Sequence, residues 1–236
     1  MRRRAPVPAP APAYEPAGPG CISPSGLPSR WLVEPVTVSV IVPTFNRPQW
    51  HARVYDCFVS QDYPHREMWV VDDSPEPSRF FKQLQDERVH YTHLAERLPT
   101  GSKRNKTLPL VGGALVAHFD DDDWYSPGYL SHMIGRLRST DSDLVTLGRW
   151  MEKVEGQNSR TLFVARQRGE LWGYGFSYLY RRHVMTRVSF PAVSHWEDFP
   201  FCFGVQDAGF KTTAVQDGAE LVEHLLHKGN TSRSAR

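Results

Sequence analysis

The most constraining feature of this sequence is a run of four aspartates, Asp120 to Asp123, directly after the apolar segment 114–119. Consecutive carboxylates repel one another strongly unless positive charge lies among them. The pattern therefore predicts a buried strand that ends at a divalent cation, and carboxylate oxygens suit hard ions such as magnesium and manganese. A solvated acidic loop is the alternative. An EF-hand is excluded because its Gly and its distal Glu are missing.

Strands and helices alternate through the first half of the chain. Apolar, β-branched runs predict strands at 36–42, 68–71, 89–91 and 114–119, and helical spacing predicts helices at 50–59, 80–85, from 101 and after Pro127. This alternation predicts an α/β fold with a Rossmann-like, mainly parallel sheet flanked by helices. The second half is less regular, with apolar runs at 144–147 and 161–164 and a helix predicted near 181–188.

Composition and charge limit the function classes. With 40% hydrophobic residues, the chain can build one sizeable core, and 12% aromatic residues argue against a disordered chain. From residue 36 onward, 24 basic side chains balance 24 acidic ones, which argues against a nucleic-acid groove. Nine of the 19 prolines lie in the first 35 residues. We therefore expect a disordered tail at 1–35, one domain at 36–232 and a short tail at 233–236.

The three cysteines are far apart, which predicts neither a disulfide framework nor a metal knuckle. The basic start is followed by alternating prolines instead of the apolar helix of a secretory signal, and no run of about 18 apolar residues is present. These features predict a cytoplasmic protein without a transmembrane segment. Peripheral contact of the basic N-terminus with acidic lipid stays open.

Three polar segments follow directly after predicted strands: 44–47, 72–73 and 120–123. Because ligands of such sheets bind beyond the carboxyl ends of the strands, we expect these segments to converge on one edge. The turn after the first strand reads Pro43-Thr44-Phe45-Asn46 and has no Gly-x-Gly-x-x-Gly, so nicotinamide binding is not supported.

The motifs also stand in a recognisable order. Pro43 to Arg47, Val70 to Ser74, Gly101 to Asn105 and Phe119 to Pro127 follow one another, and His195 to Asp198 and His227 to Ser232 come later; their residues are as printed in the sequence. In this order and spacing the chain resembles glycosyltransferase family 2, the inverting nucleotide-sugar enzymes with a GT-A fold. The resemblance covers residues 36–232 and implies a hexosyltransferase whose second half binds the acceptor.

The resemblance implies a donor site in the motifs at the strand ends. Its donor-binding residues are Thr44, Phe45, Asn46, Arg47, Asp73, Arg104, Asp120 and Asp121. Asp73 would hydrogen-bond the nucleotide base, and Phe45 would pack against that base. Arg104 would meet the diphosphate or the base.

The resemblance also implies the metal and catalytic residues. Asp122 would hold Mn²⁺ or Mg²⁺ between the phosphates, and His227 would complete the protein ligands, with His224 as a competing candidate. In the Glu197-Asp198 motif, Asp198 would be the general base that takes the proton of the acceptor hydroxyl. A structural role for Asp198 as a cap or first-turn acid of a helix over 199–208 is the alternative.

Several other residues have plainer interpretations. A helix-surface base is the plainer alternative for both Arg104 and Lys103, of which only Arg104 matches the family position. Asp72 is expected to be a turn residue and His118 a core histidine. Trp150 and Trp172 either pack in the core or line an acceptor pocket.

The sequence thus predicts a metal-dependent transferase that moves a sugar, with inversion, from a nucleotide diphosphate sugar to an acceptor hydroxyl. A uridine donor is expected, while guanosine and thymidine stay open. The acceptor is open among saccharide, lipid carrier, peptide and small natural product. Two alternatives remain: a catalytically silent nucleotide-sugar-binding protein, and a haloacid-dehalogenase-type phosphotransferase, although its Asp-x-Asp usually follows the first strand.

Overall fold

The computed structural model describes residues 35–167, 170, 172 and 174–230. The expected tails at 1–35 and 233–236 therefore lie outside the described residues, except for Pro35. Thr231 and Ser232 of the last motif also lie outside them. Among the described residues, no helix is long and apolar enough to cross a bilayer.

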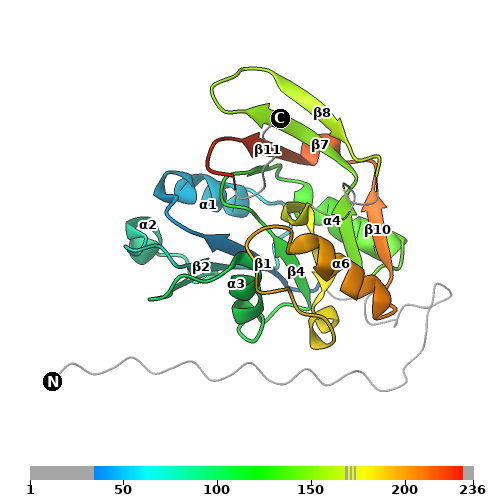
Figure 1. Ribbon diagram of the computed structural model, residues 1–236, viewed down its shortest axis with the longest axis horizontal. Helices are drawn as coiled ribbons and strands as arrows, with labels where there is room; N and C mark the ends of the chain where they lie inside the picture. Colours follow the sequence, from blue (N-terminus) through cyan, green and yellow to red (C-terminus); the bar gives the residue numbers. More distant parts are fainter. Residues whose placement is uncertain (1–34, 168–169, 171, 173, 231–236) are drawn as a thin grey trace.

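A seven-stranded sheet forms the centre of the molecule (Figure 1). Its order is β10-β6-β9-β4-β1-β2-β3, with bounds Thr212–Val215, Leu144–Leu147, Leu179–Arg181, Leu115–His118, Val38–Thr44, Arg66–Asp72 and Val89–His93. Strand β9 runs antiparallel to β4 and β6, and the other pairs are parallel. The mainly parallel sheet predicted from the alternation of elements is confirmed.

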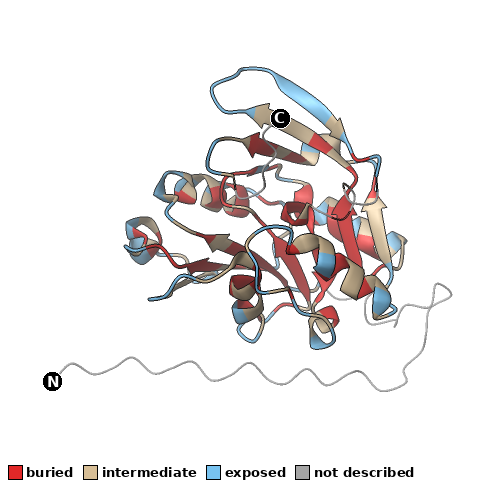
Figure 2. Cartoon of the chain, viewed as in Figure 1, coloured by how far each residue is buried: buried red, intermediate tan, exposed pale blue. Residues whose placement is uncertain are grey.

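Strand β1 shows why the sheet is buried on both faces. It reads VSVIVPT, and six of its seven residues are buried. Val40 and Val42 pack into the core on one face of the sheet, and Ile41 packs into a second cluster on the other face. β-Branched residues fit such a pleated, doubly covered strand. Figure 2 shows the resulting buried centre of the sheet.

Helices cover both faces of this sheet. The helices are α1 (His51–Val59), α2 (Arg79–Gln83), α3 (Thr100–Thr107), α4 (Tyr129–Ser139) and α6 (Asp198–Asp207). Phe58 of α1 and Met133 of α4 pack with Val40, whereas Phe201 of α6 packs with Ile41. The fold is therefore a sheet between two helical layers, as expected for this class.

A second sheet adjoins the carboxyl ends of the central strands. Its order is β5-β11-β7-β8, with bounds Trp124–Tyr125, Val222–Leu226, Arg149–Val154 and Arg160–Val164. The chain leaves β4, passes through the acidic run and enters this sheet at β5, which begins directly after Asp123. Strand β8 is its largely exposed edge (Figure 2).

A helix lies within the predicted range 181–188, but it is a short 3-10 helix and not an α-helix. Tyr180 is fully buried within β9 between β4 and β6, and a 3-10 helix, η4 (Arg182–Thr186), follows. Val184 lies in this 3-10 helix, and Val188 lies beyond its end. The other 3-10 helices are η2 (Pro48–Trp50), η3 (Gly175–Ser177) and η5 (Ala219–Leu221).

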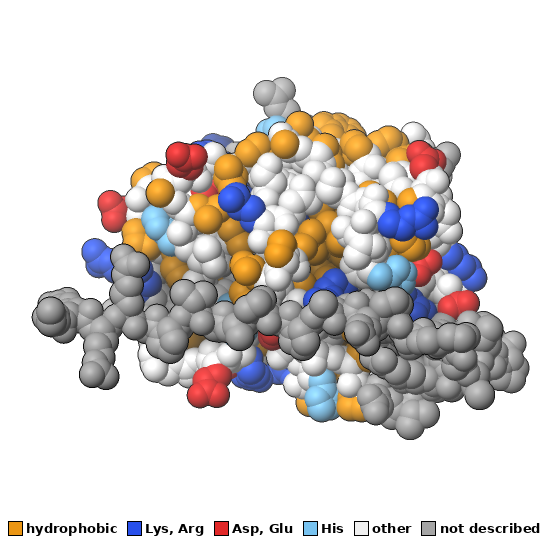
Figure 3. Space-filling model, turned by 90° about the horizontal axis from the view of Figure 1, so that it is seen from below, with side chains coloured by type: hydrophobic (Ala, Val, Ile, Leu, Met, Phe, Trp, Pro, Cys, Tyr) orange, Lys and Arg blue, Asp and Glu red, His pale blue; other side chains and the backbone are white. Residues whose placement is uncertain are grey.

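Acidic and basic side chains are interspersed on the face that Figure 3 shows. This mixed surface agrees with the balance of charges in the sequence.

Candidate active site

A cleft of about 1270 Å³ lies where the polar segments after β1 and β4 meet the C-terminal part of the chain. All the predicted site residues except Asp73 and Asp122 line it. Those two carboxylates are buried beside the cleft, with exposed fractions of 4% and 3%. The expected convergence of separate motifs on one edge of the sheet is therefore found.

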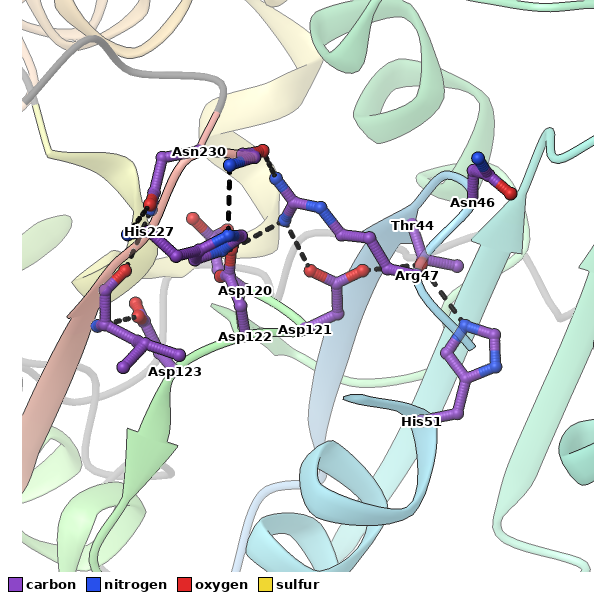
Figure 4. Close-up of polar contacts among 12 residues, drawn as sticks. Thr44, Asn46, Arg47, His51, Asp120, Asp121, Asp122, Asp123, His227 and Asn230 are labelled. Atoms are coloured by element: carbon purple, nitrogen blue, oxygen red, sulfur yellow. Dashed lines mark hydrogen bonds and ion pairs between the residues drawn. The ribbon is translucent and has the colours of Figure 1, made fainter. Parts of the chain in front are cut away.

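The turn after β1 is fixed by Asn46. Its φ is +51°, in the left-handed region that Asn tolerates better than most residues. Its backbone N–H donates to Ser74 Oγ at 2.6 Å, which ties this turn to the segment after β2. The turn places Arg47 over the acidic run (Figure 4).

Each aspartate of the acidic run has a different environment. Asp121 accepts from Thr44 Oγ1 at 2.5 Å and from Arg47 Nη1 at 2.8 Å. The same Arg47 atom lies 2.7 Å from Asp122 Oδ2. Asp120 is the most accessible of the four, with a side chain 33% exposed. The guanidinium of Arg47 thus supplies positive charge between Asp121 and Asp122 (Figure 4).

Two histidines of the last strand and its following turn complete these contacts. His227 Nε2 lies 2.8 Å from Asp122 Oδ2. His224 Nδ1 lies 2.9 Å from both oxygens of Asp123, which also accepts from Leu225 N. His224 and His227 therefore meet different aspartates, and His227 is the histidine beside Asp122.

Burial and neighbouring charges shift the pKa values in opposite directions along the run. Burial raises the pKa of Asp121 to about 6, and the neighbouring Asp122 adds to this effect, against Arg47 and Thr44. Burial opposes the ionisation of Asp122, but hydrogen bonding from His227 and the charge of Arg47 lower its pKa below the ordinary value. Burial would lower the pKa of His224, but Asp123 raises it to about 9, so His224 is protonated at neutral pH.

The donor atoms present suit a divalent ion. Asp120, Asp122 and Asp123 can each offer one carboxylate oxygen, and these oxygens lie within 4.8 Å of one another. Carboxylate oxygens of this kind are the ligands that Mg²⁺ and Mn²⁺ prefer in proteins.

Asp73 is held in a cluster that the sequence interpretation only partly anticipated. Lys103 Nζ and Arg97 Nη1 each lie 2.8 Å from Asp73 Oδ1, and Leu98 N donates to Oδ2 at 2.7 Å. Burial opposes the ionisation of Asp73, but these donors lower its pKa. Lys103 is only 3% exposed, so its expected place on a helix surface is wrong: its ammonium group is needed as the buried partner of Asp73 and Thr44 O.

Arg97 was missed from the sequence. Its guanidinium carbon lies 3.3 Å from the centre of the Phe45 ring while it pairs with Asp73. It therefore joins the two residues that the family resemblance assigns to the nucleotide base. No motif surrounds Arg97, and the available signal was its position in the loop after a parallel strand.

Arg104 connects the acidic run to the late Glu-Asp motif. Its Nη1 lies 2.8 Å from Glu197 Oε1 and 2.5 Å from Asp198 Oδ1, and its Nη2 lies 3.5 Å from Asp120 Oδ1. The arginine is only 2% exposed. Burial and the neighbouring Asp198 raise the pKa of Glu197 to about 7, although Arg104 opposes this shift.

Asp198 is the first residue of α6, so the prediction that it is a first-turn acid of a helix is confirmed. Its Oδ2 accepts from Gly175 N at 3.0 Å. A Cβ at residue 175 would lie 2.0 Å from Asp198 Oδ1, and only glycine leaves room for this approach. Both oxygens of Asp198 are thus held in place at the cleft.

The plainer interpretations are mostly confirmed. Asp72 differs from its expected place in a turn: it is the buried last residue of β2 and accepts from Ser74 N at 2.9 Å. His118 is fully buried, 3.0 Å from Gly175 O. Trp150 stacks on Phe163 at 4.5 Å and does not line the cleft. Trp172 likewise packs in a core cluster.

Comparison with known proteins agrees with this geometry. The family model described as "Glycosyl transferase family 2" matches residues 39–193. A putative teichuronic acid biosynthesis glycosyltransferase, TuaG of Bacillus subtilis, is 37% identical over 90 residues, which cover 36% of each chain. The present chain therefore spans about a third of the length of that relative.

Solved structures with low sequence identity share the fold. S. aureus TarS 1-349 in complex with UDP-GlcNAc has a TM-score of 0.68 at 20% identity, covering 83% of this chain and 60% of that one. The mannosyltransferase PcManGT of Pyrobaculum calidifontis, in complex with GDP-Man and Mn²⁺, has a TM-score of 0.65 at 20% identity, covering 86% of this chain and 64% of that one. The order of motifs, the sheet and the match over residues 39–193 together establish that the chain has the GT-A fold and belongs to glycosyl transferase family 2.

Proposed function

We propose that the chain is a metal-dependent, inverting glycosyltransferase that moves a hexose-type unit from a nucleotide diphosphate sugar to an acceptor hydroxyl. The observation that carries this proposal is the Arg104 bridge, which places Asp120 and the Glu197-Asp198 pair at one cleft. A diphosphate site and a proton acceptor are the two groups that such a transfer needs. The domain at 36–232 would hold both.

The proposed donor side consists of Thr44, Phe45 and the acidic run. Asp73 is compatible with a pyrimidine base, which favours a uridine donor. The two solved structures with bound donors contain UDP-GlcNAc and GDP-Man, so both nucleotides belong in the test. A divalent ion held by Asp122 and His227 would neutralise the charge of the leaving diphosphate.

Asp198 would be the general base. As the acceptor oxygen attacks the anomeric carbon from the side opposite the leaving group, the bond from that carbon to the diphosphate oxygen breaks and the hydroxyl proton passes to Asp198. Arg104 holds one carboxylate oxygen and Gly175 N the other. Each oxygen keeps a second lone pair for the hydroxyl. Proton removal of this kind typically contributes about 10²- to 10⁴-fold in rate.

The test is release of nucleoside diphosphate from UDP-glucose, UDP-N-acetylglucosamine and GDP-mannose, with Mn²⁺ or with a chelator. We expect metal-dependent release from one of these donors. Asp122→Asn should also abolish the Mn²⁺-dependent thermal stabilisation by the matching nucleotide, because a bound ligand stabilises by mass action. Asp56→Asn, an exposed acid on α1, is the matched control. Nucleotide binding without any release would identify a silent binding protein and contradict the proposal.

A further inference from the structure

Trp196 is the most exposed of the large hydrophobic side chains in the described part of the chain. Its exposed fraction is 77%, whereas the next most exposed, Leu110 and Val193, are at 45% and 44%. It also lines the cleft, directly before Glu197 and Asp198. A large aromatic ring left in water at a cleft is typical of a binding surface.

The backbone of Trp196 is strained. Its φ is +63°, in the left-handed region, which is an outlier for a bulky residue. Such a conformation is energetically unfavourable and persists only where the surroundings impose it. Packing of the indole offers little compensation, because the side chain is mostly exposed.

The surroundings impose this turn from both sides. Before it, Val193 O accepts from Gly101 N at 3.1 Å and Ser194 Oγ accepts from Thr100 N at 3.3 Å. A Cβ at residue 101 would lie 2.0 Å from Pro191 O, so glycine is what lets this loop approach α3. After the turn, Arg104 holds the carboxylates of Glu197 and Asp198. The loop that carries Trp196 is thus attached to α3 at both ends.

The chemistry of the cleft indicates what the indole binds. The face of an aromatic ring is negatively polarised, so it attracts the partially positive C–H groups on one face of a pyranose ring. The hydroxyls at the rim of the same sugar need polar partners. His195 beside Trp196, and Glu155 and Gln167 elsewhere in the cleft lining, are side chains of that kind. A polyprenyl chain would instead need a continuous apolar surface, whereas polar and charged side chains are spread through this lining.

We propose that the indole of Trp196 is the stacking platform for a pyranose ring of the acceptor, so that the acceptor is a saccharide or carries one. The Cα atoms of Trp196 and Asp198 are at most about 7 Å apart, because two residues of chain span no more than that, and both residues line the same cleft. The inference rests on the proposed transfer reaction and assigns it an acceptor class. It also gives the strained turn a purpose, since the turn presents the ring beside the base.

The experiment is ¹⁹F NMR of the full chain labelled with 5-fluorotryptophan, in the presence of UDP and Mn²⁺. The chain has seven tryptophans, and Trp196→Phe assigns the resonance of Trp196 by its loss. The probes are methyl glycosides of glucose, galactose, mannose and N-acetylglucosamine, with the acyclic polyol sorbitol as the control ligand. Trp124, which is 36% exposed and does not line the cleft, serves as the reference resonance.

We expect at least one glycoside to shift the Trp196 resonance saturably, while sorbitol leaves it unchanged and Trp124 does not respond. Trp196→Ala should weaken binding of that glycoside about fivefold to tenfold, and Trp196→Tyr should restore most of it, because stacking is retained. Binding is measured by saturation-transfer NMR of the glycoside. Trp124→Phe is the matched control variant and should leave glycoside binding unchanged.

Three outcomes would overturn the inference: no glycoside shifts the resonance, sorbitol shifts it equally, or only vesicles of phosphatidylglycerol and phosphatidylcholine do so. Metal-dependent donor hydrolysis, measured on the same protein, separates this failure from failure of the proposed function. Hydrolysis without a glycoside response defeats the platform alone. A glycoside response without hydrolysis defeats the transferase proposal and leaves a sugar-binding cleft.

Discussion

The cleft has a wall, formed by the segments 44–47, 72–73 and 120–123 at the strand ends, and a rim, formed by residues 193–196. The two differ in the burial and pairing of their side chains. On the wall, Asp73, Asp121 and Asp122 are buried, and each pairs with a basic side chain of the same chain. On the rim, Trp196 is 77% exposed and is positioned only through its backbone. Buried charges need partners, whereas an exposed ring does not. The wall is therefore electrostatically organised before any ligand binds, and the rim is a surface left free for one.

The variant with the largest expected effect is at Asp198, where the wall and the rim meet. Asp198→Asn keeps the shape and the hydrogen bond from Gly175 N but removes the proton acceptor. We expect sugar transfer to fall about 10²- to 10⁴-fold, with thermal stabilisation by UDP and Mn²⁺ retained. Glu220→Gln, an exposed acid outside the cleft, is the control. Transfer at the parent rate would refute the role of base.

Removing the buried cation that links both regions should have the next largest effect. Arg104→Met leaves Glu197 and Asp198 without their counterion, and unpairing a buried charge costs about 3–5 kcal/mol. Chemical denaturation should show this loss. Arg88→Met removes an exposed partner of Asp86 and should cost less than about 1 kcal/mol. Similar losses for both variants would mean that burial of Arg104 is unimportant.

The His224–Asp123 pair predicts a dependence of stability on pH. The folded-state pKa of His224, about 9, is above its ordinary value of 6.5. Its contribution is therefore fully present below pH 6.5 and is lost as the pH rises through about 9. His224→Gln should lower the free energy of unfolding by about 3 kcal/mol at pH 6.

The measurement is the difference in unfolding free energy between parent and His224→Gln across this pH range. The difference should shrink towards pH 9. His90→Gln, at a partly exposed histidine outside this pair, is the matched control. A difference that stays constant with pH would exclude a protonated His224 in the folded state.

The smallest loss of stability is expected when Arg97 is replaced. This variant compares an exposed and a buried partner of the same carboxylate within the wall. Both Arg97 and Lys103 bind Asp73, but their side chains are 47% and 3% exposed. Arg97→Met should cost less than about 1 kcal/mol, because water screens an exposed pair. Lys103→Met should cost clearly more. Thermal denaturation of the two variants gives the order directly, and a reversed order would contradict this account.

Much of the fold and of the wall could be predicted from the sequence because both are local. The β-branched run of β1 and the apolar run of β4 end in polar motifs, and parallel strands bring those ends together. Arg97, by contrast, stands in no motif. Its role follows from contacts to Phe45 and Asp73 that only the assembled loops create.

The second half resisted prediction for a related physical reason. Strand β9 is three residues long, and it is a strand because β4 and β6 offer it hydrogen bonds on both sides. Lys103 was misplaced because a lysine in a polar helix is usually at the surface, and here a buried Asp73 outweighs that preference. Tertiary context decided both cases.

The position of β11 determines which part of the chain must be present before the donor site is complete. This strand inserts between β5 and β7 and precedes His227 by one residue, yet its His224 meets an aspartate 101 residues earlier. A contact of such long sequence separation requires the closing of a long loop, which costs conformational entropy. A polypeptide cut before Val222, or still being synthesised at that point, would have the central sheet sequence but an acidic run without its imidazoles. Competence to bind a donor would therefore arise only once this last strand is in place.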